Sequence, residues 1–199
     1  PKDASSRLVD VIANDENVAK HFHLPVQSGS NRILGLMNRR YTREQYIEKA
    51  LEIKEKVPGV SLTTDIICGF PTETDEDFEQ TLSLVKQVGF DMIYTFIYSR
   101  RVGTVADKME GQIPRDISNQ RFKALSELEN GIAEELNARF IGETVRVLSD
   151  GLNKNGIPCG RSTQNKIVTF DKPVPAGEFA DVIIDTAGGY ALAGRIKEQ

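Results

Sequence analysis

The segment from Ser61 to Phe78 combines residue types that could bind a small charged ligand. A run rich in β-branched residues contains one acid, Asp65, and ends in Gly69, Phe70 and Pro71. A cluster of threonines and acids then begins an amphipathic helix. This order places backbone N–H donors and a carboxylate at the carboxyl end of a strand, where α/β proteins bind ligands. An ordinary strand-to-helix connection is the competing interpretation.

Polar residues also follow two other apolar stretches. The stretch 21–26 reads as a short strand that enters the turn Gln27, Ser28, Gly29 and Ser30. Gln27 and Ser28 could hydrogen-bond the hydroxyl or ammonium groups of a ligand, with Gly29 allowing a close backbone approach. A turn that only caps the next helix through Ser30 explains these residues equally well. The stretch 90–98 reads as a third strand, apolar on both faces, and is followed by further polar residues, Ser99 and Arg101.

Helical segments alternate with these strands and must position them. Helices are predicted at 4–14, at 31–37, from a Thr42–Gln45 capping pair to Val57, and from a Thr74–Asp77 capping pair to Gly89. The apolar positions of the third helix are Tyr46, Ile47, Ala50, Leu51 and Ile53. Strands joined by helices indicate right-handed βαβ units and a parallel sheet. Three such units cannot close an eight-stranded barrel, and the strand at 22–26 would leave an exposed edge that could pair with another chain.

The last third of the chain follows a different period. A long helix is predicted from Pro114, taken as its first residue, to Phe140, and Gly142 ends it. The period then changes to two, with short strands at 144–148, 166–170, 181–185 and 190–196. Four or five short strands in about 60 residues indicate a small β-barrel of the oligonucleotide-binding type. We therefore expect two domains, residues 1–140 and 141–199.

Composition narrows the class of protein. The 199 residues carry a net charge of −4 and 39% hydrophobic residues, which indicates a globular chain and argues against binding polyanions over its whole surface. Residues 151–175 are basic, with Lys154, Arg161, Lys166 and Lys172 against Asp171, and are the best candidate for contact with nucleic acid. No apolar run is long enough to cross a bilayer, so a cytoplasmic location is expected, and the two cysteines, far apart, suggest neither a disulfide framework nor a metal site. Because the sequence starts at Pro1 inside an apparent βα unit, we expect a truncated or processed fragment.

Three ordered segments carry a resemblance to a known family. They read H-L-P-V-Q-S-G-S at 23–30, T-D-I-I-C-G-F-P-T-E-T at 64–74 and F-I-Y-S-R-R-V-G-T at 96–104. Together with M-N-R-R-Y-T at 37–42 and the β-rich tail, they resemble the radical S-adenosylmethionine methylthiotransferases over essentially the whole chain. The tail segment C-G-R-S-T-Q-N-K-I-V at 159–168 is similar to the tRNA-modifying, MiaB-type branch of that family.

The resemblance implies an α/β fold, the C-terminal part of a (β/α) radical SAM barrel, followed by a small all-β TRAM domain that binds RNA. It implies a methylthio group added to C2 of N6-isopentenyladenosine beside the anticodon, with S-adenosylmethionine and 4Fe-4S clusters in the full-length enzyme. The residues it implies for S-adenosylmethionine are Gln27, Ser28, Gly29, Arg39 (or Arg40), Asp65, Gly69 and Phe70. A buried Asp65 should also have a partner, either a ligand group or an arginine.

Further residues are implied at the substrate entrance and in the tail. Tyr98, Ser99 and Arg101 would form the rim, with a structural salt bridge as the alternative for Arg101. In the tail, Lys154, Arg161, Asn165 and Lys166 could contact the anticodon stem-loop of a tRNA, although exposed basic residues often serve only solubility.

Several departures from the family pattern change what this chain is expected to do. The three-cysteine cluster motif is absent, so we expect no catalytic residue, metal or cofactor in this chain, which alone should be inactive. Thr72 stands where the family usually has Gly, and Arg100 and Val102 stand where Pro is usual. Three alternatives remain: a relative that modifies a ribosomal protein, a non-catalytic RNA-binding module, and an unrelated barrel enzyme acting on phosphorylated metabolites.

Overall fold

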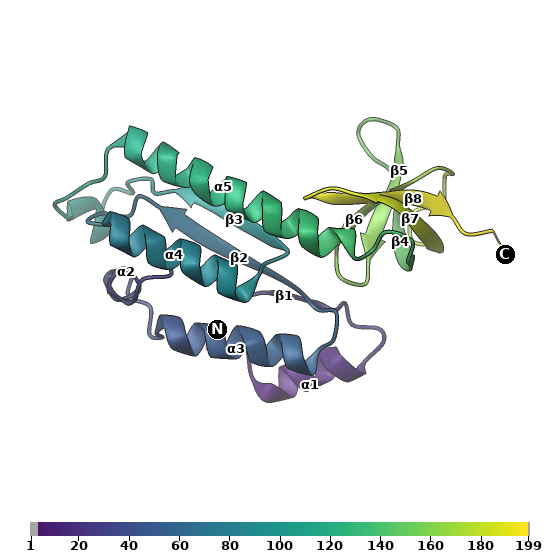
Figure 1. Ribbon diagram of the computed structural model, residues 1–199, viewed down its shortest axis with the longest axis horizontal. Helices are drawn as coiled ribbons and strands as arrows, with labels where there is room; N and C mark the ends of the chain where they lie inside the picture. Colours follow the sequence, from purple (N-terminus) through teal and green to yellow (C-terminus); the bar gives the residue numbers. More distant parts are fainter. Residues whose placement is uncertain (1–3, 199) are drawn as a thin grey trace.

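The computed structural model describes residues 4–198 and divides them between a layer of helices on a sheet and a barrel (Figure 1). A long helix, α5, runs from the sheet to the barrel. The elements of the first part are α1 (Ser6–Asn14), β1 (His21–His23), α2 (Asn31–Leu36), α3 (Arg43–Lys56), β2 (Ser61–Cys68), α4 (Asp75–Val88), β3 (Met92–Ile97), the 3₁₀ helix η1 (Ala106–Lys108) and α5 (Arg115–Ala138).

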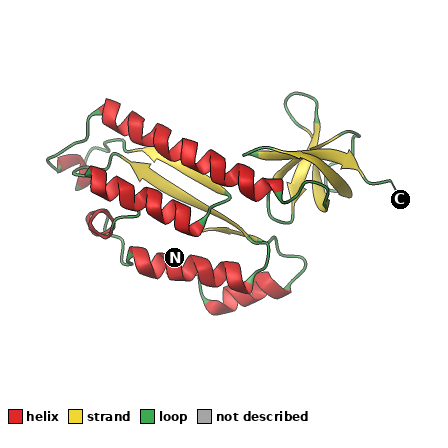
Figure 2. Ribbon diagram, viewed as in Figure 1, coloured by secondary structure: helices red, strands yellow, loops and turns green. Residues whose placement is uncertain are grey.

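The three strands of the first part are parallel, in the order β1-β2-β3, as the βαβ pattern predicts (Figure 2). Alternate side chains of β2, including Leu62 and Ile66, are buried in a core shared with α1, α3, α4 and α5. The prediction that the third strand is apolar and buried on both faces is wrong. Tyr94 and Phe96 are 48% and 51% exposed, because no described element covers the other face of the sheet.

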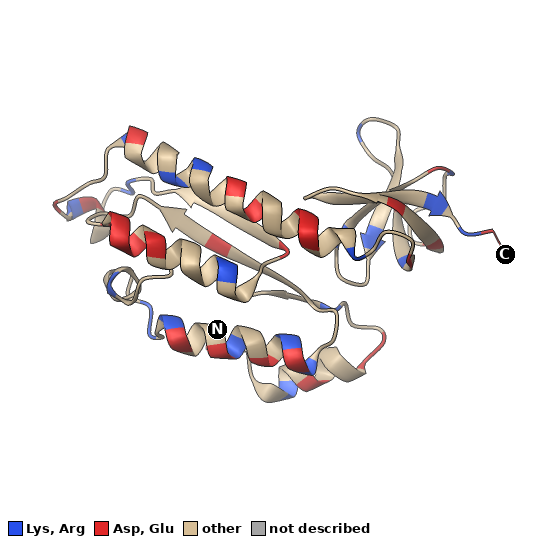
Figure 3. Cartoon of the chain, in the orientation of Figure 1, with Lys and Arg blue, Asp and Glu red and all other residues tan. Residues whose placement is uncertain are grey.

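Helix ends follow the local sequence signals. Thr42 and Thr74 each begin a helix in a complete capping box, so both predicted pairs are confirmed. Figure 3 shows the acidic first turn of α4, whose negative charges suit the positive end of a helix dipole. Pro114 is the N-cap of α5 and not its first helical residue. Leu51, predicted to be in the core, is 42% exposed because it lies beside the buried stripe of α3.

The second part is a closed barrel with the strand order β4-β5-β6-β8-β7, in which only β6 and β8 pair in parallel. The strands are β4 (Thr144–Leu152), β5 (Pro158–Ser162), β6 (Ile167–Phe170), β7 (Phe179–Ala187) and β8 (Ala191–Ile196). Val147, Val168, Val182 and Leu192 are fully buried at its centre. The predicted small barrel is confirmed, and β5 is the strand that the sequence pattern did not locate, because its residues do not alternate between apolar and polar.

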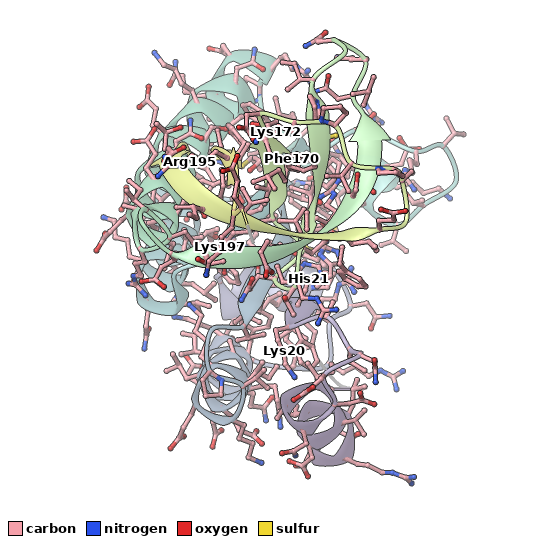
Figure 4. All side chains as sticks on the ribbon, turned by 90° about the vertical axis from the view of Figure 1, so that its right-hand side faces the viewer. Lys20, His21, Phe170, Lys172, Arg195 and Lys197 are labelled. Atoms are coloured by element: carbon pink, nitrogen blue, oxygen red, sulfur yellow. The ribbon has the colours of Figure 1, made fainter. Side chains whose placement is uncertain are left out.

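The barrel docks on the end of the sheet where the parallel strands begin. The Thr163 carbonyl accepts a hydrogen bond from the Lys20 N–H at 2.8 Å, just before β1. Figure 4, viewed from the barrel end, shows Lys20 and His21 beneath the barrel. Lys166 Nζ lies 2.7 Å from Asp91 Oδ1, just before β3, with both side chains about nine-tenths buried. The carboxyl ends of the strands therefore point away from the barrel (Figure 1).

Candidate functional site

A hollow of about 490 Å³ lies at the carboxyl ends of the strands, where ligands bind in parallel α/β proteins. It brings together five residues that the sequence marked as candidates: Gln27, Phe70, Tyr98, Ser99 and Arg101. Its remaining wall is formed by Ile67, Phe96, Ile97, Thr104 and Ala106. Apolar and aromatic walls with a few polar groups are typical of a small-molecule site.

Gln27 reaches this hollow through an unusual backbone conformation. Its φ is 71°, a left-handed value that costs a residue with a side chain about 1–3 kcal/mol. Two hydrogen bonds to β2 hold it there: its N–H donates to Asp65 O at 2.8 Å, and its carbonyl accepts from Ile67 N at 3.0 Å. This pairing adds one residue to the edge of the sheet and places the Gln27 amide at the wall of the hollow.

Ser28, Gly29 and Ser30 instead hold their loop against α4. Gly29 N donates to Thr81 Oγ1 at 2.9 Å, and a Cβ at Gly29 would lie 2.5 Å from Thr81 Cα. Glycine is therefore required here by the approach of a helix. Ser28 Oγ accepts from Ser30 N, while Ser30 caps α2 and donates to Asp77 Oδ1 at 2.6 Å. Neither Ser28 nor Gly29 lines the hollow, and the interpretation of this turn as a helix cap fits the observed contacts.

Arg32 and Asp77 join the same loop to the start of α4. Burial alone would raise the pKa of Asp77, but hydrogen bonds from Arg32, Ser30 and Thr74 hold this pKa far below its usual value. Arg32 also donates to Thr72 Oγ1 at 3.1 Å. Thr72 has a φ of 68°, a left-handed value that glycine adopts more readily than threonine.

Arginines near the loop differ in their surroundings. Arg39 and Arg40, the predicted candidates for a ligand carboxylate, are both exposed, and neither lines the hollow. Arg101 is exposed at the rim and does line it, and among the described residues no salt bridge is formed by its side chain. The sequence offered no signal for Arg32, since its partner Asp77 lies 45 residues away along the chain.

Glu73 fixes the turn after β2 from inside. This side chain is 4% exposed, accepts from Gly69 N at 2.8 Å and forms an ion pair with Arg121 Nη1 at 2.8 Å. Burial raises the pKa of Glu73, although the Gly69 N–H and Arg121 act to lower it. Gly69 has a φ of 74°, and a Cβ there would lie 2.2 Å from Ser118 Oγ on α5. The N–H donor predicted for a ligand is therefore used within the protein, and sequence reasoning missed both Glu73 and Arg121.

Phe70 and Tyr98 form the aromatic wall of the hollow. Their ring centroids are 5.3 Å apart in an edge-to-face arrangement. The Tyr98 hydroxyl is buried and has no hydrogen-bond partner among residues 4–198. A buried hydroxyl is normally satisfied by hydrogen bonding, so this one fits a ligand that brings a donor or an acceptor.

Asp65 lies on the open face of the sheet, two residues before Ile67, with its side chain 26% exposed. Its partner is His23 Nε2 on the neighbouring strand at 3.5 Å, where an arginine or a ligand group was predicted. The His23 ring also packs edge-on against Tyr94, with centroids 5.7 Å apart. Asp65 does not line the hollow, so its contact with a ligand remains a prediction.

The described residues do not fit an iron–sulfur cluster. Within 4–198 no three His, Cys, Asp or Glu side chains are grouped as metal ligands. Burial raises the pKa of the Cys68 thiol to about 12, and Cys159 lies in the barrel. The hollow does fit S-adenosylmethionine in part: aromatic walls suit its adenine, Gln27 and the Tyr98 hydroxyl offer hydrogen bonds, and Arg101 offers a cation for a carboxylate.

The candidate RNA-binding residues separate into two groups. Arg161, Asn165 and Lys166 gather at the junction of sheet and barrel, in a groove that also contains His21, Tyr94, Asn137 and Tyr190. Lys154 lies in the exposed β4–β5 loop, outside this groove. The Lys166 amine is engaged with Asp91, while Arg161 and Asn165 are exposed. Sequence patterns could not place Tyr94 beside the tail, because that proximity depends on how the barrel docks.

Both parts of the chain are similar to known proteins. The Radical SAM superfamily matches residues 6–85, and the TRAM domain matches residues 138–197. The tRNA-2-methylthio-N(6)-dimethylallyladenosine synthase of Acetivibrio thermocellus is 46% identical over 199 residues, which cover 98% of this chain and 42% of the relative. Enzymes of the same name are 46% identical in Anoxybacillus flavithermus and 45% identical in Bacillus cytotoxicus; both matches cover 100% of this chain and 38% and 40% of the relatives.

Among solved structures, coproporphyrinogen III oxidase from Escherichia coli, described as a radical SAM enzyme, has a TM-score of 0.54 at 18% identity. The match covers 67% of this chain and 31% of the oxidase and indicates a shared fold. The chain spans about two fifths of the length of the curated relatives it matches. Within residues 4–198, no helix has the length and apolar character needed to cross a membrane.

Proposed function

Because this chain belongs to the radical S-adenosylmethionine methylthiotransferase family, we propose that it serves a tRNA methylthiotransferase. The reaction is the addition of a methylthio group to C2 of N6-isopentenyladenosine beside the anticodon. The observation that carries this proposal is the 46% identity to tRNA-2-methylthio-N(6)-dimethylallyladenosine synthase, which extends through both the sheet and the barrel. In this proposal, the sheet contributes to the S-adenosylmethionine site, and the barrel holds the RNA.

The hollow at the carboxyl ends of the strands is the proposed S-adenosylmethionine site. Phe70 would wall the adenine, Gln27 and the Tyr98 hydroxyl would hydrogen-bond its polar groups, and Arg101 would bind its carboxylate. When bound and reduced by one electron from a source outside residues 4–198, S-adenosylmethionine would supply the 5′-deoxyadenosyl group that takes a hydrogen atom from the substrate. The residues of this chain orient the ligand and exclude water from one side of it. Since the described residues offer no ligand set for a cluster, no step on a cluster is assigned to them.

The barrel is the proposed RNA-binding domain, with a tRNA anticodon stem-loop as its partner. The exposed cations Lys154 and Arg161 and the amide of Asn165 are the residues proposed to contact phosphates and unpaired bases. Arg161 would exchange an exposed ion pair with Asp150, whose Oδ2 lies 3.9 Å from its Nε, for the phosphate. Lys166 is excluded from this set because its amine is paired with Asp91. Two exposed cations give modest affinity that falls as salt concentration rises.

A chimaera tests the proposed activity. Residues 4–198 would replace the matching segment of the Acetivibrio thermocellus relative, and tRNA nucleosides from cells that lack the native enzyme would be analysed by mass spectrometry. We expect the chimaera to restore the 2-methylthio nucleoside, and a chimaera that carries Lys172→Ala, an exposed position on the barrel, to do so equally well. A stable chimaera that binds S-adenosylmethionine but leaves this nucleoside unmodified would contradict the proposal.

A non-catalytic RNA-binding module is the second candidate, favoured by the lack of cluster ligands within 4–198. It predicts binding of the stem-loop without any binding of S-adenosylmethionine. Equilibrium dialysis of S-adenosylmethionine against the chimaera and its Phe70→Ala variant distinguishes the two candidates. A ribosomal-protein substrate would instead appear as methylthiolation of protein by the chimaera, with tRNA unchanged.

The outer edge of β1 is the proposed surface for self-association. β1 pairs only with β2 among the described strands, so its other edge keeps free backbone groups. The contact of Lys20 N with Thr163 O engages the start of this edge. Sedimentation equilibrium would report a dimer that weakens when His23→Pro removes a donor of the outer edge, and a monomer at all concentrations would refute the pairing.

A further inference from the structure

The open face of the sheet, which no described element covers, presents polar and aromatic side chains. Asp65 and Ile67 of β2 lie on this face and alternate with the buried Ile66. They pair in register with Tyr94 and Phe96 of β3, so the four side chains lie side by side. We call these four residues the open-face patch. Ile67 and Phe96 also line the hollow proposed for S-adenosylmethionine, so the patch and the hollow are continuous.

The carboxylate of Asp65 is available to a ligand that donates a hydrogen bond. Its side chain is 26% exposed, and its ion-pair partner within residues 4–198 is His23 Nε2 at 3.5 Å. That separation is longer than a usual hydrogen bond of about 2.7–3.2 Å. An ionised carboxylate has two oxygens that accept hydrogen bonds. A partly buried carboxylate with so distant a donor favours a ligand N–H or O–H.

A chain of hydrogen-bonding side chains holds His23 beside Asp65. His23 Nδ1 lies 3.0 Å from Thr63 Oγ1, and the same oxygen lies 3.1 Å from His21 Nε2. Burial, together with nearby His23, lowers the pKa of His21, so its imidazole is neutral near pH 7. Because a carboxylate only accepts, His23 turns an N–H toward Asp65, and Thr63 holds the other nitrogen of the ring. The imidazole is therefore fixed on one side of the carboxylate and leaves the rest of it to a ligand.

The geometry of the patch matches the modified end of the proposed substrate base. In N6-isopentenyladenosine, the exocyclic nitrogen carries one N–H and a branched, apolar isopentenyl group. Asp65 and Ile67 are two residues apart on β2, which is about 7 Å at about 3.3 Å per residue. The isopentenyl group reaches about 5 Å from N6, given bonds of about 1.5 Å, and apolar groups contact each other at about 4 Å. An N6 bound at Asp65 therefore brings the isopentenyl carbons onto Ile67 and Phe96.

We propose that the open-face patch selects the isopentenylated adenine, with Asp65 accepting the N6–H and with Ile67 and Phe96 contacting the isopentenyl carbons. This inference rests on the proposed function, because it names how that site recognises its substrate. The substrate base must lie beside the hollow, since its reacting atom has to meet a group of the S-adenosylmethionine bound there. Unmodified adenosine leaves both apolar side chains uncovered and should bind about ten-fold to one-hundred-fold more weakly. The adenine of S-adenosylmethionine offers the same kind of N–H donor, and the experiment separates the two ligands.

Fluorescence anisotropy with the chimaera and labelled anticodon stem-loops tests the apolar part of the patch at one fixed salt concentration. One stem-loop carries N6-isopentenyladenosine and the other carries adenosine, and the ratio of their Kd values measures the discrimination. Phe96→Ala should reduce this ratio about five-fold or more, whereas Phe96→Leu keeps an apolar contact and should retain most of it. The matched control is Phe179→Ala, which removes an aromatic residue that is 60% exposed on the barrel and should leave the ratio unchanged.

A third stem-loop tests the hydrogen bond to Asp65. Its N6 carries a methyl group in addition to the isopentenyl group, so it has no N–H to donate. The wild-type chimaera should bind it about ten-fold more weakly than the isopentenylated stem-loop, and Asp65→Ala should bind the two equally. Thr63→Val should lose part of this preference and Thr63→Ser should keep it, because serine retains the hydroxyl that holds His23. Asp181→Ala, which removes an exposed acid of β7, is the control and should behave as wild type.

The outcomes separate the patch from the proposed activity. A wild-type ratio near one, or ratios unchanged in Phe96→Ala and Asp65→Ala with circular dichroism confirming the fold, would overturn the patch. Weaker S-adenosylmethionine binding by Asp65→Ala in equilibrium dialysis, with the N–H preference intact, would also overturn it and assign the carboxylate to the cofactor. If the chimaera discriminates as expected but forms no 2-methylthio nucleoside, the proposed activity fails and the patch stands. If the nucleoside forms but the variants discriminate as wild type does, the patch fails and the activity stands.

Discussion

Lys166→Met removes the amine that neutralises Asp91 between the sheet and the barrel. In the native protein, Lys166 Nζ lies 2.7 Å from Asp91 Oδ1, and the two side chains are 9% and 11% exposed. Asp91 Oδ2 accepts a second hydrogen bond from Leu62 N at 2.9 Å. The amine also lies 5.7 Å from the centre of the Phe140 ring. Methionine fills a similar volume, so the substitution mainly removes charge and leaves the carboxylate buried without its cation.

The cost follows from the burial of the pair. Removing one partner of a buried ion pair typically costs 3–5 kcal/mol, because a charge stays buried without compensation. Because Asp91 keeps its hydrogen bond from the Leu62 N–H, the cost should lie at the lower end of this range. We therefore expect the free energy of unfolding to fall by about 3 kcal/mol. For a chain of this length, each kcal/mol lowers Tm by about 2–4 °C, so the expected decrease is about 6–12 °C.

Differential scanning calorimetry of wild type, Lys166→Met, Asp91→Asn and the double variant measures this cost. The double variant should lose less than the sum of the two single losses, with a coupling energy of about 1–3 kcal/mol. Because this ion pair joins the sheet to the barrel, we also expect Lys166→Met to separate the melting of the two parts. Lys172→Met, which breaks an exposed ion pair with Glu198, is the control and should leave Tm unchanged.

Two results would refute this reasoning. Additive losses in the cycle would show that the two side chains do not interact. An unchanged Tm for Lys166→Met, together with a loss of RNA affinity equal to that of Arg161→Ala, would show that the Lys166 amine contacts phosphate and does not lock the barrel to the sheet.

Two further predictions concern the sheet part. Gly29→Ala should lower the free energy of unfolding in urea by about 1–3 kcal/mol, because the added Cβ would meet the α4 backbone at Thr81. The control Gly35→Ala lies in open space on α2 and should raise the free energy of unfolding by about 0.5–1 kcal/mol. Equal effects of the two substitutions would refute the close packing. Burial raises the pKa of Glu129, although the Ile93 N–H opposes this, so the folded state takes up a proton at Glu129 and this group stabilises the fold increasingly as pH falls from neutral toward about 4.5. Because Glu73 contributes in the same direction, Glu129→Gln should reduce the pH dependence of Tm without abolishing it, and curves parallel to wild type would contradict the assignment.

Much of the fold could be predicted from the sequence because its signals are local. The capping boxes at Thr42 and Thr74 join residues three positions apart, and both form as predicted. The alternation of strands and helices predicts the parallel sheet, and the change of period after Gly142 predicts the barrel. The open face of β3 could not be predicted, since an apolar strand reads the same whether or not another element covers it.

The candidate site was predictable only in part. Gln27, Phe70 and Tyr98 follow strands in the sequence, and parallel strands bring their carboxyl ends together, so these residues meet in the hollow. Gly29 was predicted to allow a close backbone approach of a ligand, and Gly69 was predicted to contact the ligand. The structure instead places the backbone of α4 and the side chain of Ser118 on α5 against them.

The sequence by itself determined the order of the elements, the two-part architecture and the family, because each depends on patterns over a few residues or on similarity along the whole chain. Only the tertiary structure decided which side chains are free to bind. Lys166 pairs with Asp91 across 75 residues, and Glu73 pairs with Arg121 across 48. Whether a charge faces a ligand or a distant partner depends on which segments pack together, and local patterns carry no information on such contacts.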